Sequence, residues 1–164
     1  MAVTHADLIE AAQVAESAAA NEAEFRGVCS RAYYAIFQDG QAFHFGLPTQ
    51  GNLPADFEGG MHARLIQQLI TPGISRSDPL FFKSMSIGYL MKSLYAKRIK
   101  ADYYRELDMD KPTAGTAISE ATKIIAAIKD THPPSPTPPA SATQPQSEES
   151  GTAKSSRPTL HRIK

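Results

Sequence analysis

The sequence predicts an all-α protein, a helical bundle of about five helices over residues 1–130 followed by a disordered tail over residues 131–164. Apolar residues recur at helical spacing in several segments, and no run alternates apolar and polar residues as a strand does. The composition changes abruptly near residue 131. Helices of this length bury their apolar faces against one another, so a bundle is the expected architecture.

Capping patterns mark the first two helix starts. Thr4 followed by Asp7 precedes an Ala- and Glu-rich segment over residues 5–20, and Asn21 followed by Glu24 precedes the strongest periodic signal. In that second segment the residues at spacings of three or four are Phe25, Cys29, Ala32, Ile36, Gly40, Phe43 and Leu47. This spacing indicates one helix face directed at a core.

Three further helices follow a Pro- and Gly-rich loop over 46–60. The third covers Met61–Ile70 and ends at Thr-Pro-Gly, and the fourth covers Leu80–Leu107. The fourth places Ile87, Met91, Leu94 and Arg98 on one face, and a last helix does the same with Ile118, Ala121, Ile125 and Ile128.

The tail holds seven of the twelve prolines and, as large aliphatic residues, Leu160 and Ile163. Such a segment cannot bury enough apolar surface to offset an ordering entropy of roughly 1–2 kcal/mol per residue. We interpret its basic end, residues 157–164, as a solvated terminus, with a docking peptide or a weak polyanion contact as the alternatives.

Composition narrows the class of protein. The 17 Lys and Arg residues balance the 17 Asp and Glu residues, so no global field attracts nucleic acid. No run approaches the roughly 18 apolar residues of a membrane span, and the start lacks a signal-peptide pattern. With Cys29 as the single cysteine, we expect a soluble, cytoplasmic protein that does not contact a membrane.

Two motifs carry a resemblance to a known family. The first runs RGVCSRAYYAIF over residues 26–37, and the second runs LYAKRIKADY over residues 94–103. Together they resemble the HEPN superfamily, in particular its small prokaryotic branch with SRAYYAxF early and RxxADY late, and the likeness covers about residues 5–130. The resemblance implies a helical bundle that commonly dimerises. It also implies a nucleotidyltransferase-like partner protein in toxin–antitoxin, defence or stress systems.

Active members of that family are metal-independent ribonucleases that use an Arg and a His with four to six residues between them. None of the five histidines of this chain follows an Arg at that spacing. By the resemblance, Arg98 stands at the catalytic arginine, Asp102 and Tyr103 stand in the histidine region, and Gln38 replaces a frequent histidine. An aspartate with a pKa near 3.9 beside an arginine is a poor acid at neutral pH, so catalysis is not expected.

Spacing also predicts a polar network. Arg98 and Asp102 share one helix face, and Arg31, Tyr34 and Gln38 share another. We expect these faces to meet, with Asp102 bridging Arg98 and Arg31, either as a buried network that fixes helix register or as a remnant active site or ligand groove.

Other features have two interpretations each. Tyr33, Tyr34, Tyr95, Tyr103 and Tyr104 are expected in the core, with a base-stacking surface as the alternative. Lys92, Lys97, Arg98, Lys100 and Arg105 go around the fourth helix and are expected to be solvated, with an RNA-facing or partner-facing patch as the alternative. His44 and His62 lack metal-ligand spacing, so no metal or cofactor is predicted.

The sequence therefore predicts a non-catalytic HEPN-like interaction module, as a homodimer or as the partner of a nucleotidyltransferase-like protein. The alternative is a divergent metal-independent ribonuclease, or an RNA-binding protein, that uses Arg98, Asp102 and Tyr103.

Overall fold

The computed structural model describes residues 3–130, and in this part the chain forms five α-helices and no strand. The helices are α1 (His5–Ala18), α2 (Glu22–Phe45), α3 (Met61–Ile70), α4 (Pro79–Tyr103) and α5 (Lys111–Lys129). The predicted all-α class is confirmed. The predicted disordered tail over 131–164 lies outside the described residues.

Side-chain caps begin four of the five helices. The Thr4 hydroxyl and the Asp7 carboxylate form the predicted capping box at α1, and the Asn21 side chain accepts from the Glu24 amide at α2. Asp78 and Asp110 cap α4 and α5, each just before a proline in the first turn. These local interactions set where each helix enters the bundle.

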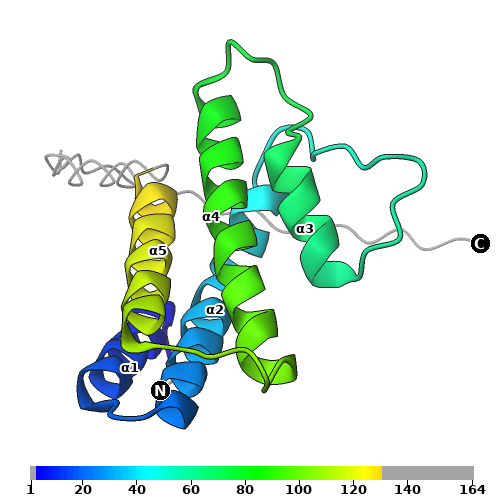
Figure 1. Ribbon diagram of the computed structural model, residues 1–164. Coiled ribbons are helices and arrows are strands. Elements are labelled where there is room, and N and C mark those ends of the chain that lie inside the picture. The colour runs from blue at the N-terminus through cyan, green and yellow to red at the C-terminus, as the bar shows by residue number, and fades with distance from the viewer. Residues whose placement is uncertain (1–2, 131–164) are drawn as a thin grey trace, which may run out of the picture. The chain divides into compact units, whose positions relative to one another are not determined.

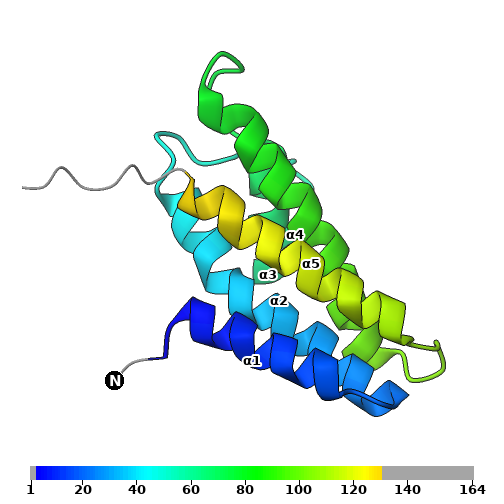
Figure 2. The same ribbon diagram turned by 90° about the vertical axis from the view of Figure 1, so that its left-hand side faces the viewer.

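Helix α2 is the centre of the bundle and contacts each of the other four helices. Figures 1 and 2 show α1, α4 and α5 packed around it, with α3 on the side of α4 away from α5. The predicted core face of α2 is confirmed, since Cys29, Ala32 and Ile36 are fully buried and Phe25 packs at its edge. Burial of these side chains supplies the main driving force for folding.

Helix α4 crosses α2 with its predicted apolar face inward. Ile87, Met91 and Leu94 are fully buried. Gly88 lies so close to α3 that an added Cβ would come within 2.9 Å of the Ile70 backbone nitrogen. The predicted extension of this helix to Leu107 is wrong, because α4 ends at Tyr103 and is followed by a turn.

Helix α5 buries the face predicted for it, but the burial is deepest earlier in the helix than expected. Ala114, Ala117 and Ile124 are fully buried together with Ala121. The predicted Ile125 and Ile128 are only partly buried and line shallow depressions beside α1. Small alanines at the first turns let α5 approach α2 closely. The predicted face was based mainly on the isoleucines and did not include these alanines.

Candidate functional site

Arg98, on α4, is the centre of a polar and aromatic cluster. Its Nε lies 2.8 Å from Asp102 Oδ2, an ion pair at i and i+4 whose angle is too poor for a hydrogen bond. Its Nη2 donates to the Tyr34 hydroxyl of α2 at 2.5 Å. The guanidinium carbon lies 5.2 Å from the ring centroids of both Tyr34 and Tyr103. The guanidinium therefore contacts one carboxylate and two tyrosine rings.

The surroundings of Arg98 favour its charged form. Burial lowers the pKa of Arg98, but the charge of Asp102 and the contacts with Tyr34 and Tyr103 outweigh it, so the pKa ends above its ordinary value. With a side chain that is 11% exposed, Arg98 presents little of its charge to solvent. Its charge is already partly balanced by Asp102, which weakens the attraction for a phosphate.

Asp102 connects α4 to α2, although not through the predicted partner. One carboxylate oxygen faces Arg98, and the other accepts a hydrogen bond from the Ser30 hydroxyl. Within the described residues Arg31 makes no ion pair with Asp102. The Arg98 half of the predicted bridge is present and the Arg31 half is absent.

The geometry of α2 explains this difference. Each helical residue turns by about 100°, so Ser30 and Tyr34 lie on either side of the α4-facing direction while Arg31 and Gln38 lie outside it. Arg31 and Gln38 are exposed, and Arg31 lines a shallow depression between α1 and α2. Of the five predicted network residues, the structure brings Tyr34, Arg98 and Asp102 together and leaves Arg31 and Gln38 outside.

The tyrosines divide into two groups. Tyr33 is fully buried and Tyr95 packs against the core, as predicted. Tyr34, Tyr103 and Tyr104 are 48%, 64% and 47% exposed, so their predicted place in the core is wrong. Tyr34 and Tyr103 flank Arg98 and Tyr104 directly follows α4, and none of the three is covered by a helix of the described part of the chain.

His62, on α3, also lies in this region. Residue spacing along α2 and α4 could not predict a contact from a third helix. The Nδ1 of His62 lies 2.8 Å from the Tyr33 hydroxyl, and its ring packs against Phe37 and Tyr95. Burial, and after it the positive charge of Arg98, lower the pKa of His62. A neutral imidazole thus stands within the electrostatic reach of Arg98, contributed by a different helix.

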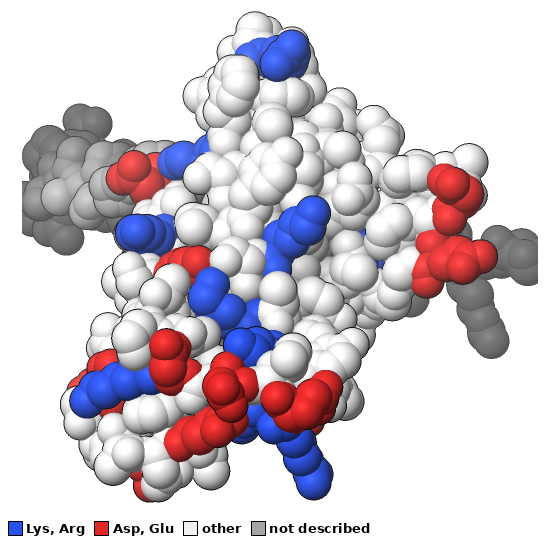
Figure 3. All heavy atoms as spheres, viewed as in Figure 1, with Lys and Arg blue, Asp and Glu red and all other residues white. Residues whose placement is uncertain are grey.

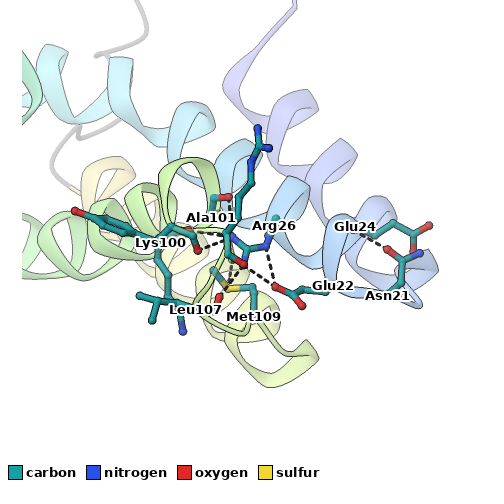
Figure 4. Close-up of polar contacts among 11 residues, drawn as sticks. Asn21, Glu22, Glu24, Arg26, Lys100, Ala101, Leu107 and Met109 are labelled. Atoms are coloured by element: carbon teal, nitrogen blue, oxygen red, sulfur yellow. Dashed lines mark hydrogen bonds and ion pairs between the residues drawn. The ribbon is translucent and has the colours of Figure 1, made fainter.

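Arg26 determines where α4 ends. As Figure 4 shows, its side chain points from α2 into the end of α4, beside Glu22. The guanidinium donates to the backbone carbonyls of Lys100, Ala101, Tyr104, Arg105 and Leu107, at 2.6–3.3 Å. This cation satisfies carbonyls that a helix end leaves unpaired. The first motif therefore stabilises the end of the second and holds the exposed tyrosines in position.

The basic residues of α4 and of the turn that follows it do not form one patch. Lys97 pairs with Glu120 of α5 at 2.9 Å, and Arg98 pairs with Asp102. Lys92 and Arg105 are exposed. On the face viewed in Figure 3, basic side chains are scattered and acidic side chains gather near the lower end. The predicted solvated position is therefore confirmed for Lys92 and Arg105 and wrong for Lys97 and Arg98, whose side chains are only 19% and 11% exposed.

Comparison of the chain with protein-family models, curated proteins and solved structures gave no match. The HEPN resemblance therefore stays a prediction based on the two motifs. Among residues 3–130 no helix is long and apolar enough to cross a membrane, and no cluster of three or more His, Cys, Asp or Glu side chains could hold a metal ion.

Proposed function

We propose that this chain is a non-catalytic HEPN-like interaction module, and that it docks another protein through the exposed residues around Arg98. We call Tyr34, Tyr103, Tyr104 and Leu107 the tyrosine face; all four side chains are between 46% and 64% exposed. Tyrosine and arginine are enriched where protein interfaces carry most of their binding energy. The observation that carries the proposal is the exposed pair Tyr34 and Tyr103, both of which contact the part-buried guanidinium of Arg98.

The commitment of Arg98 supports a binding role over a catalytic one. Cleavage of RNA without metal needs a cation for the phosphate and groups that exchange protons near neutral pH. Here the guanidinium is paired with Asp102 and enclosed by Tyr34 and Tyr103. An arginine in that state is well suited to fix the two rings for docking.

The partner we propose first is a second copy of the chain, and the second is a nucleotidyltransferase-like protein. Both follow from the HEPN resemblance, as does a place in a toxin–antitoxin, defence or stress system. We place the module in the cytoplasm, where the buried thiol of Cys29 would stay reduced.

Sedimentation velocity across a concentration series tests the docking face. Tyr103→Ser removes a ring that is 64% exposed, so it should weaken association and leave the fold intact. Tyr89→Ser is the matched control, since Tyr89 is 53% exposed on the same helix but outside the tyrosine face. Equal association of both variants, or a wild-type monomer that also ignores a purified nucleotidyltransferase-like partner, would contradict the proposal.

A divergent ribonuclease that uses Arg98, Asp102 and Tyr103 is the second candidate. It is favoured by His62, whose lowered pKa leaves a neutral imidazole near Arg98. Purified protein would be incubated with structured RNA in the presence of a metal chelator. Cleavage that disappears in Arg98→Ala and His62→Ala, but persists in Lys92→Ala, would replace the docking proposal with this one.

A further inference from the structure

A second region of interest lies between the end of α2 and the start of α3 and shares no residue with the tyrosine face. A depression of about 380 Å³ opens there. Its volume is at the small end of the range in which proteins bind small molecules. Its lining combines His44, amide side chains, two exposed apolar side chains and one arginine.

His44 is the unusual member of the lining. The residue is 1% exposed, and neither Nδ1 nor Nε2 has a hydrogen-bond partner. Burial lowers the pKa of His44, so the ring is neutral near pH 7 and carries one donor and one acceptor. A buried polar side chain without any partner is rare in folded proteins and calls for an explanation. The two nitrogens of an imidazole point in diverging directions, so a ligand group that donates or accepts would satisfy the nitrogen that it meets.

The remaining side chains indicate what else the ligand carries. Phe45 and Met61 are 61% and 63% exposed and line the same depression, which provides an aromatic ring and a thioether for a flat apolar body. Gln41 and Gln50 have no side-chain hydrogen bond within the described residues, so their amides are free to bind polar groups of a ligand.

Arg64 supplies the charge. It is the one charged side chain in the lining of the depression, it is exposed, and it makes no ion pair with any described residue. A guanidinium fork matches the two oxygens of a carboxylate. One positive charge balances a carboxylate, whereas a phosphate monoester would keep an unbalanced negative charge.

The geometry points to a binding site for a small heteroaromatic carboxylate, with Arg64 on the carboxylate, Phe45 on the ring and His44 hydrogen-bonded to one polar atom of the ring edge. His44 lines the depression, but both of its nitrogens are covered in the structure, so a ligand that bonds to one of them must displace a neighbouring side chain. The site is independent of the proposed docking function.

Calorimetric titration of the full chain tests the site with named probes. Orotate carries a carboxylate and a ring edge with adjoining N–H and C=O groups, so it should bind and shift the His44 ring signals in NMR spectra. Uracil lacks the carboxylate and benzoate lacks the edge, so each should bind at least about tenfold more weakly. Uridine monophosphate tests a phosphate in place of the carboxylate.

Two variants and a control define the result. His44→Phe removes both unpaired nitrogens and should fold at least as well as the wild type, yet bind orotate about tenfold more weakly or worse. Arg64→Gln should show the same loss, and Arg76→Gln, outside the depression, should bind like the wild type. Absence of orotate binding at millimolar concentration would overturn the proposal. Equal binding of benzoate, tighter binding of uridine monophosphate, or full affinity in either variant would also overturn it.

Discussion

Replacing Arg26 by alanine should destabilise the whole domain through the end of α4. The side chain is 15% exposed and donates to five backbone carbonyls beyond its own helix. Three of those carbonyls are exposed and can bind water instead, whereas the bonds to Lys100 and Ala101 are partly buried. At about 1.5 kcal/mol for each charged hydrogen bond that water does not replace, the expected loss is about 3 kcal/mol.

Urea and thermal unfolding, followed by circular dichroism, measure this loss. A decrease of about 3 kcal/mol corresponds to a fall of roughly 10 °C in Tm for a domain of this size. Arg26→Lys keeps the charge but not the planar fork, so it should lose about half as much. Arg31→Ala is the matched control on the same helix, because Arg31 is exposed. If Arg26→Ala and Arg31→Ala differ by less than about 0.5 kcal/mol, the carbonyl contacts do not stabilise the fold and the reasoning is wrong.

Three other changes have calculable outcomes. Gly88→Ala forces a Cβ against the backbone of α3 and should lower the free energy of unfolding in urea by about 2 kcal/mol. Gly27→Ala meets no atom within 4 Å and should raise that free energy by about 0.5–1 kcal/mol. Equal effects would contradict the close approach of α3 to α4. Burial lowers the pKa of His44, so as the pH falls the imidazole becomes protonated in the unfolded chain before it does so in the folded chain. The free energy of unfolding should therefore decrease as the pH drops through about 6.5. His44→Phe should flatten that part of the curve of urea midpoint against pH, and an unchanged curve would argue against a neutral His44 in the fold. Glu120→Gln leaves the mostly buried Lys97 without its counter-charge and should lower the free energy of unfolding by about 1–2 kcal/mol in urea at low salt. Adding Lys97→Met to this variant removes the unpaired charge and should reduce that loss.

Much of the fold could be predicted because it depends on local signals. The capping residues Thr4 and Asn21 act within one helical turn, and the apolar face of α2 repeats often enough to be recognised. The end of α4 could not be predicted in this way. It depends on Arg26, which lies more than seventy positions earlier in the chain and meets those carbonyls only after α2 and α4 have packed.

The candidate site was predicted in part for the same reason. Arg98 and Asp102 are one helical turn apart, so their pairing follows from helix geometry. The residues of α2 that contact this pair are Ser30 and Tyr34, not Arg31. That choice depends on the rotation of α2 about its own axis, which the sharing of a helix face does not specify. His62 comes from a third helix, whose placement beside Tyr33 is a property of the packed bundle.

Amide hydrogen exchange of the full chain, measured alone at low concentration and again with its partner or at high concentration, tests the docking proposal most directly. The account predicts new protection in residues 98–107 and around Tyr34 when the complex forms, with no such gain in Tyr103→Ser. Formation of a complex that leaves these amides unchanged and protects another surface would contradict the account.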